Sequence, residues 1–330
     1  MFNRWFNAGV VGFWLVAMSW LLSQKVIPPL MPGDPPDYQA ALAVRPDGSP
    51  PEIVCWNVDW NGRFIGIAAS RPVPNADGTE LRSVIRFTKL PVREMLGQLL
   101  GKMALLLNQS LGDENFAPNL VVSTRMQFDS QRKLQGFQTV IDLPELPRMI
   151  DLDAQVSPTG KLKMKASAAN GFEAPGAPQP RVTFRQELDL PPDALVGDSL
   201  APRAELRNLK VGQQWTIPTY RPFPPNSPVQ ILLAKVERRE FITWNDEPTD
   251  TLVVAYHDEA GSGLGSARGP IGRAWVEPNG TILRQEVMLS SMKFTFERVP
   301  PGFSNDAAKW LDDEAFAPHF AEFATSESKP

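Results

Sequence analysis

The chain has 330 residues, a length that allows one large domain or two of ordinary size. Hydrophobic residues make up 42% of it and charged residues 21%, so a substantial core can form. The formal net charge of −4 offers no basic surface, and we therefore expect no nucleic-acid partner. Proline occupies 33 positions, twice the share of about 5% that is typical of proteins, and this favours a β-rich chain with many short connections.

An apolar run near the amino terminus, residues 6–22, is interrupted only by Asn7 and Ser19. Its length is at the short limit of the roughly 17–25 residues that cross a bilayer as a helix. Arg4 precedes the run and aspartates follow it, a charge asymmetry that favours a cytoplasmic amino terminus and an external body. We therefore predict a signal anchor over residues 1–25, a single transmembrane helix that tethers a periplasmic or other extracytoplasmic body to the cytoplasmic (inner) membrane.

A cleaved signal peptide is the alternative interpretation of the same run. The residues at 23–26 make a poor cleavage site, and the better small-residue pattern at 41–43 lies too far downstream. Residues 26–51 contain several proline pairs and predict an extended, semi-rigid linker.

Beyond the linker, the predicted organisation is a β-rich body over residues 52–303. A proline-containing stretch at residues 191–202 marks a possible internal break in that body. Residues 304–330 contain a short apolar pattern typical of a helix, followed by a polar tail.

Strand signals dominate the predicted body. Apolar and polar residues alternate over residues 54–60, which predicts a strand with an aromatic face that carries Trp56 and Trp60. Asn61-Gly62 follows and favours a tight hairpin turn, because both residues tolerate a positive φ. Further alternating runs recur at intervals of about ten residues, which is typical of antiparallel sheets.

Residues 90–111 carry the pattern of a helix inside this β-rich body. Pro91 suits a first helical position, and the apolar residues that follow, Leu99 and Met103 among them, recur at helical spacing. The stripe they form is wide and has to be covered. We predict a mostly β (α+β) fold in which a strongly curved antiparallel sheet or open barrel surrounds this one long apolar helix. The helix is either an ordinary core element or a plug in an apolar cavity.

The later part of the body resembles a known arrangement. Residues 200–212 (LAPRAELRNLKVG), strand patterns at 229–240 and 252–256, and Trp275 followed by Asn279-Gly280 occur in the order found in an uncharacterised family of bacterial envelope proteins. Together with the curved sheet, this order resembles the half-barrel of the bacterial carriers that localise lipoproteins. The resemblance implies a β-rich half-barrel in the cell envelope and carries no catalytic motif.

Catalytic and metal-binding residues are scarce. The chain has two histidines and one cysteine, too few for a zinc site built from these ligands, and we expect no metal or cofactor. His257 ends a strand pattern beside a glycine-rich loop, so a hydrolase that uses it is conceivable, but no nucleophile motif accompanies it. His319 lies near the carboxyl terminus. Cys55 cannot form an intramolecular disulfide and is interpreted as a small buried residue.

Three lysines, Lys161, Lys163 and Lys165, alternate along one strand pattern and share one face. They could contact an anionic partner. Lysines on an outer or edge strand also protect a sheet against unwanted pairing, so both interpretations stay open.

The leading hypothesis is a membrane-anchored, non-catalytic protein that binds an apolar ligand, such as a lipid, or an envelope protein partner through its half-barrel. The residues expected to line the cavity are Trp56, Trp60, Leu99, Met103, Met126 and Phe128. The alternative is a structural or accessory subunit of an envelope complex with a filled core and no pocket.

Overall fold

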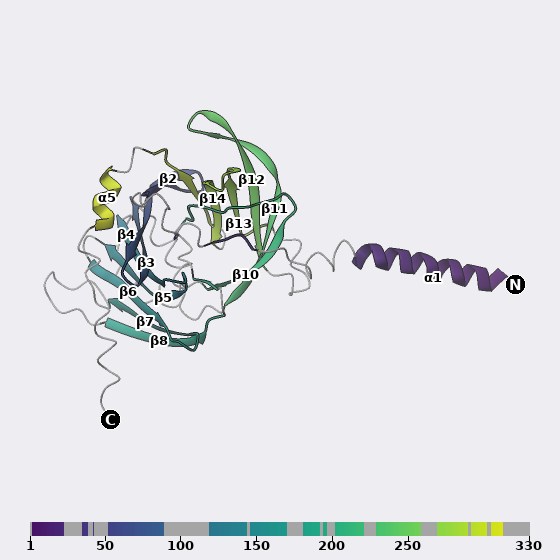
Figure 1. Ribbon diagram of the computed structural model, residues 1–330, viewed down its shortest axis with the longest axis horizontal. Coiled ribbons are helices and arrows are strands. Elements are labelled where there is room, and N and C mark those ends of the chain that lie inside the picture. The colour runs from purple at the N-terminus through teal and green to yellow at the C-terminus, as the bar shows by residue number, and fades with distance from the viewer. Residues whose placement is uncertain are drawn as a thin grey trace, which may run out of the picture.

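The computed structural model describes most of the chain (Figure 1). The described residues are 2–22, 35–38, 42, 52–88, 119–143, 146–169, 181–191, 194–196, 202–220, 229–258, 269–289, 292–301 and 305–312.

The described elements are two helices and fifteen strands. The helices are α1 (Phe2–Leu21) and α5 (Asn305–Asp312). The strands are β1 (Val54–Trp60), β2 (Arg63–Asn75), β3 (Gly78–Phe87), β4 (Leu120–Asp129), β5 (Leu134–Leu143), β6 (Leu146–Val156), β7 (Lys161–Ala169), β8 (Arg181–Asp189), β9 (Leu195–Val196), β10 (Gln214–Tyr220), β11 (Gln230–Trp244), β12 (Glu247–Asp258), β13 (Gly272–Val276), β14 (Ile282–Leu289) and β15 (Met292–Arg298).

All fifteen described strands belong to one sheet, which curls into a barrel-like shape (Figure 1). The order is β8-β7-β6-β5-β4-β3-β2-β1-β15-β14-β13-β12-β11-β10-β9. Each half is therefore a meander of sequential neighbours, and the pairing of β1 with β15 joins the halves. The pairs are antiparallel except β9 with β10, which is parallel. The β-rich, barrel-like character agrees with the expectation from sequence.

Positive φ angles at the hairpin turns explain why the strands reverse where they do. Asn61 and Gly62 have φ of 51° and 82°, as a two-residue turn of the expected kind requires. Asn245 and Asp246, at 52° and 62°, form a second such turn between β11 and β12. That turn allows a hairpin longer than the sequence pattern predicts, because β11 runs on to Trp244.

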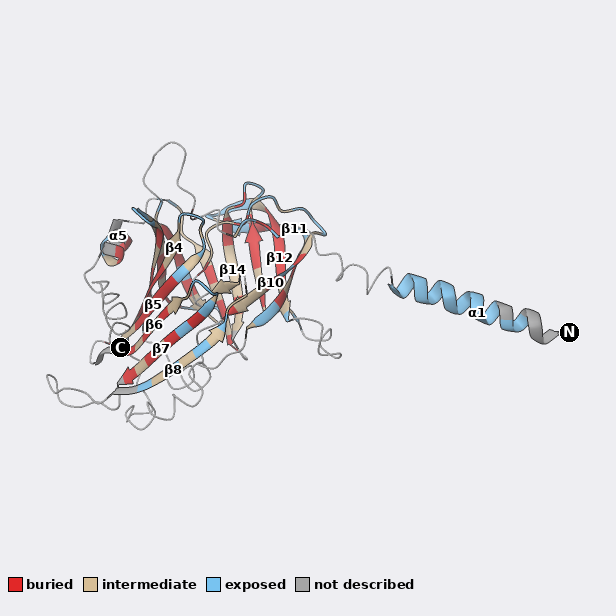
Figure 2. Cartoon of the chain, turned by 60° about the horizontal axis from the view of Figure 1, so that its bottom comes forward, coloured by how far each residue is buried: buried red, intermediate tan, exposed pale blue. Residues whose placement is uncertain are grey.

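The main core lies on the inner face of the curled sheet. Alternate residues of β1 and β15 are almost fully buried there, including Trp56, Phe294 and Phe296 at 0% exposure. Apolar residues of β2–β4 and β10–β14 join the same cluster from other walls. Leu206, from a segment between β9 and β10, is also fully buried in it. Strands from all sides thus share one interior (Figure 2).

A second inner cluster spans the two edges of the sheet, β8 and β9. It combines residues of β4–β8 with Tyr220 of β10, whose hydroxyl lies 3.7 Å from the sulfur of Met164. Leu188 near the end of β8 and Val196 in β9 pack on the same cluster. Side chains, not a strand pair, therefore bring these two edges together. This junction is called the seam below.

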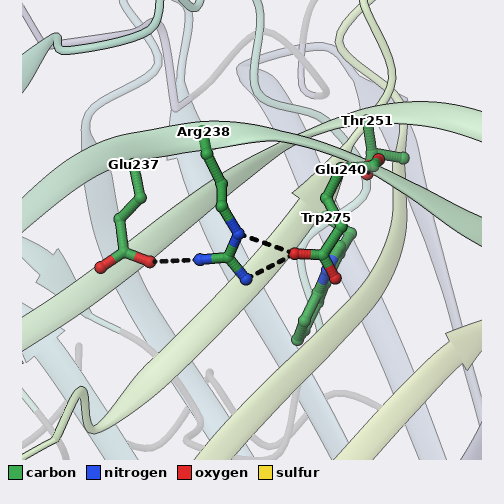
Figure 3. Close-up of polar contacts among 5 residues, drawn as sticks. All are labelled: Glu237, Arg238, Glu240, Thr251 and Trp275. Atoms are coloured by element: carbon green, nitrogen blue, oxygen red, sulfur yellow. Dashed lines mark hydrogen bonds and ion pairs between the residues drawn. The ribbon is translucent and has the colours of Figure 1, made fainter.

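Two smaller clusters cover parts of the outer face. Beneath α5, Ala307 and Leu311 bury the outward side chain of Cys55, and α5 lies against β2 and β3. The other cluster includes Trp275 of β13. This residue pairs with Val253 of β12, close to the irregularity in the β11–β12 pairing. There Arg238 donates to Glu240 at 2.9 Å, and Trp275 Nε1 donates to the same carboxylate at 3.3 Å (Figure 3).

The predicted sheet wrapped around a long apolar helix is wrong. The helices of the described residues are α1 and α5, and neither is a long apolar helix inside the sheet. The physical reason is that the strands bury one another across the interior, so their inner faces are covered without a central helix. Residues 90–111, to which the helix was assigned, lie outside the described residues.

The predicted transmembrane anchor, and with it the single-pass location in the cytoplasmic (inner) membrane, is also overturned. A helix does form at the amino terminus, and α1 has 20 residues with exposed side chains such as Phe13 and Val16. Even so, no helix in the described part of the chain is both long and apolar enough for a membrane span. Asn3, Arg4 and Asn7 fall inside α1 and dilute its apolar run.

Replacement of Trp56 by alanine tests the interior packing directly. Because the ring is fully buried, Trp56→Ala should lower the free energy of unfolding by about 3–5 kcal/mol. Phe64→Ala is the matched control, since Phe64 is 54% exposed on the neighbouring strand β2, and it should change stability by about 0.5 kcal/mol or less. Denaturant unfolding of the full chain measures both. A loss below 1 kcal/mol for Trp56→Ala would contradict the assigned inner face.

Candidate functional site

A cavity of about 910 Å³ lies within the curled sheet and reaches one of its ends. Part of its wall is the second inner cluster, represented by Leu81, Met126, Phe128 and Leu134. Residues of the seam, Leu190 and Val196 among them, also line it. The opposite wall comes from β10–β14. The cavity thus exists because the strands enclose more space than their inner side chains fill.

A segment from the amino-terminal part of the chain, residues 35–38 and 42, enters this space. The Tyr38 hydroxyl accepts a hydrogen bond from Trp215 Nε1, and the two rings lie 6.4 Å apart. The Leu42 carbonyl accepts from Thr79 Oγ1 at 3.5 Å on the opposite half of the sheet. Asp37 forms an ion pair of 3.0 Å with Arg132 in the β4–β5 turn. These contacts hold Tyr38 and Leu42 in the cavity wall.

A second inserted segment, residues 202–207, lies against β14, β15 and the β13–β14 turn. The backbone N–H of Arg203 donates to Gln285 Oε1 at 3.2 Å, and that of Leu206 donates to the Gly280 carbonyl at 2.8 Å. Arg298 Nη1 donates to the Ala204 carbonyl at 3.2 Å. The Arg203 guanidinium is held at the cavity, 4.8 Å from the centre of the Tyr38 ring.

The polar groups around Tyr38 perturb one another. Burial raises the pKa of Tyr38 well above 10.0, with a further increase from Tyr256, while Arg203 and the Trp215 hydrogen bond act in the opposite direction. Burial also raises the pKa of Tyr256, and Arg203 and hydrogen bonding to Tyr38 lower it. Both phenols therefore stay neutral at physiological pH, where they serve as hydrogen-bonding groups.

Arg298 is the second arginine of this wall. Burial lowers its pKa, while the carboxylates of Glu52, Glu205 and Glu277 raise it. Its guanidinium also lies 6.0 Å from the centre of the Trp56 ring. Three carboxylates thus act on Arg298, whereas no ion pair in the described part of the chain involves Arg203.

The residues expected to line a cavity fall in three groups. Met126 and Phe128 line the observed one. Trp56 and Trp60 belong to the main core; Trp56 is fully buried, and Trp60 packs against the core as a partly buried residue. Leu99 and Met103 lie outside the described residues. Both tryptophans lie on β1, as the sequence predicts. They pack in or against the main core and do not line the cavity.

Several cavity residues were missed by the sequence analysis. Tyr38 and Leu42 lie in the stretch assigned to a linker, where a tyrosine carries no periodic signal. Arg203 lies outside any strand and entered the sequence analysis only as one residue of the segment 200–212. Tyr256 had a usable signal, because it alternates in phase with Leu252 and Val254, both buried.

The lysine row lies on the outer face of β7. Lys161 forms an ion pair of 3.2 Å with Glu187 of β8, and both side chains are about half exposed. Lys163 is paired in register with Glu187, and Lys165 with Asp153 of β6. β7 lies between β6 and β8 in the sheet, so these lysines do not lie on an edge strand that they could protect. An anionic partner for this row stays a prediction.

The remaining candidates gather no catalytic group around them in the described part of the chain. His257 alternates with the inward Tyr256 and faces outward, and no hydrogen bond joins it to a described serine, cysteine or carboxylate. Cys55 is buried under α5, and burial raises the pKa of its thiol while Arg298 lowers it. The described residues contain no group of three or more His, Cys, Asp or Glu arranged to hold a metal ion. His319 lies outside the described residues.

Comparisons with known proteins leave the family of this chain open. No family model and no curated protein matches the chain. Among solved structures, the chain is similar to a β-barrel-like protein of a domain of unknown function, DUF1849, from Brucella abortus. The two share 14% sequence identity at a TM-score of 0.38, over 78% of this chain and 98% of that protein. The β-barrel-like description of the present chain follows from its own sheet.

Alkaline titration tests the buried phenols. The three tyrosines of the chain are Tyr38, Tyr220 and Tyr256, and burial raises the pKa of Tyr220 to about 12. Since all three pKa values are raised on folding, their contribution to stability is complete below pH ~10 and is lost as the pH rises towards the folded values.

We expect the native protein to show less phenolate absorbance at pH 10 than the chain unfolded in guanidinium, which should be about half ionised there. Ultraviolet spectra recorded immediately after a pH jump measure both states. A native titration with a midpoint near 10 for any tyrosine would contradict the assigned burial.

Proposed function

We propose that the protein is a non-catalytic binding protein that holds one small apolar ligand inside its barrel-like sheet. The observation that carries this proposal is the cavity of about 910 Å³, which lies within the range of roughly 300–1,000 Å³ common for ligand sites. Most of the side chains that reach into it from the strands are apolar. Polar and charged residues line other parts of the cavity, and three of the polar groups, Tyr38, Tyr256 and Arg203, converge at one place in its wall, where they could orient a ligand.

A small ligand suits this site better than a protein partner. The cavity is concave and enclosed by strands, and protein partners usually bind exposed surfaces of standard size. An accessory subunit with a filled core is also disfavoured, because a filled core leaves no such space. A hydrolase is disfavoured in turn, since His257 faces outward, away from the cavity.

Binding of a neutral fluorescent probe, N-phenyl-1-naphthylamine, tests the proposal. We expect saturable binding by the full chain with one site per molecule. Leu232 is 7% exposed and lines the cavity, so Leu232→Trp should occupy the space of the probe. The affinity should fall about tenfold or more, which corresponds to 1.4 kcal/mol of binding free energy.

Ile231→Trp is the matched control, because Ile231 is the preceding residue of β11, faces outward and is 41% exposed. It should leave binding unchanged, and α1 with its exposed apolar side chains is the same in both variants. Leu81→Trp on the opposite wall provides a second blocked cavity in case Leu232→Trp melts early. Equal binding by wild type and all three variants would place the probe outside the cavity and contradict the proposal.

A further inference from the structure

The cavity wall contains one half-buried cation without a carboxylate partner. Among the described residues, no ion pair involves Arg203. Its backbone N–H donates to Gln285, and its guanidinium stacks on the Tyr38 ring. A guanidinium held at an apolar cavity without a counter-charge is an unfavourable arrangement unless an anion arrives.

The carboxylates of the same wall already have cationic neighbours. Glu205 pairs with Arg207 at 2.7 Å, and Glu286 pairs with Lys293 at 2.8 Å. Glu52 lies close enough to Arg298 to raise its pKa. These pairs leave Arg203 as the half-buried lining cation with its charge uncompensated. Lys133 also lines the cavity, but it is exposed in the β4–β5 turn, where water solvates it.

The groups next to Arg203 suit an oxyanion. Burial keeps the phenols of Tyr38 and Tyr256 neutral, so each retains a proton to share. Tyr38 accepts from Trp215 and is also hydrogen bonded to Tyr256, so the two hydroxyls form one connected polar group beside Arg203. An arginine beside phenolic hydroxyls matches the acceptor oxygens of a carboxylate, which guanidinium binds with two parallel hydrogen bonds.

The rest of the cavity suits a hydrocarbon chain. From the polar wall it extends to the second inner cluster, where Leu81, Met126, Phe128 and Leu134 line it. Val156 and Leu190 of the same cluster also line it, while Asp129 and Lys133 line it at the β4–β5 turn. A ligand with one charged end and one apolar end would therefore match both parts at once.

We propose that the ligand of this cavity is an amphiphile with a single carboxylate, which binds at Arg203 while its hydrocarbon chain lies along the second inner cluster. This inference rests on the proposed function and names the ligand class. We assign a single negative charge to the ligand because Arg203 is the guanidinium without a carboxylate partner among the described residues. Glu52, Glu205 and Glu286 lie in the same wall. A dianionic headgroup such as a phosphate monoester would be repelled by them.

Displacement of N-phenyl-1-naphthylamine by three molecules of equal chain length provides the test. These are dodecanoate, dodecanol and dodecyl phosphate, each used below its micelle concentration. Hydrogen bonds to a charged group predict that dodecanoate binds wild type about tenfold to a hundredfold more tightly than dodecanol. Dodecyl phosphate should bind more weakly than dodecanoate.

Arg203→Gln should lower the affinity for dodecanoate to that for dodecanol and leave dodecanol unchanged, and Arg203→Lys should restore part of the preference. Arg239→Gln is the matched control: it removes the same charge from the outer face, where Arg239 is 64% exposed and 3.5 Å from Asp250. It should keep the full preference. Thermal melts establish that each variant is folded.

The outcomes separate the two proposals. If the probe does not bind wild type saturably, the proposed function fails. If the probe binds but dodecanoate is no better than dodecanol, only the anionic site fails, and this comparison needs no variant. A preference that survives in Arg203→Gln overturns the role of Arg203. Tighter binding of dodecyl phosphate overturns the single carboxylate.

Discussion

The pairing of β1 with β15 is the contact on which the rest of the structure depends. Each half of the sheet is a meander of strands that are neighbours in sequence. When Trp56 pairs with Arg298 and Trp60 with Phe294, the first and last strands of the body join. The inner faces of the two halves then bury one another, and Trp56, Phe294 and Phe296 become the centre of the main core. Because this contact joins distant parts of the chain, it has a high loop-closure cost that only the shared core can offset.

The seam completes the enclosure by a different kind of interaction. β8 and β9 end the described sheet, and apolar side chains around Tyr220 and Met164 hold these edges together. Dispersion and burial tolerate small displacements better than a ladder of hydrogen bonds does, since they are not directional. The seam is therefore the part of the wall whose displacement costs the least free energy. Leu190 and Val196 line the cavity at this wall, so the seam is part of the cavity boundary.

Features of the fold that depend on local interactions were predictable from sequence, whereas features that depend on contacts between distant residues were not. Period-two alternation in β1 and the Asn61-Gly62 turn are local, and both were correct. The β11–β12 hairpin was underestimated because Asn245-Asp246 is a weaker turn signal than Asn-Gly. The apolar pattern at residues 90–111 led to a wrong architecture, since periodicity indicates that a face is buried but not what buries it. The anchor was wrong for a related reason: an apolar run was judged by its length, while Asn3, Arg4 and Asn7 fall inside the same helix.

The site was less predictable than the fold because two of its three central polar residues, Tyr38 and Arg203, do not come from the periodic parts of the chain, whereas Tyr256 of β12 does. The strands supply apolar wall residues such as Met126 and Phe128, and these follow from alternation. Tyr38 and Arg203 come from segments without regular structure that lie in the interior. A strand that presented charged residues at those inner positions would lose part of the burial that holds the two halves together. Inserted segments avoid that loss, because their backbones are held by bonds to Gly280, Gln285 and Thr79. The chemistry of the cavity can thus vary with these segments while the sheet that encloses it stays the same.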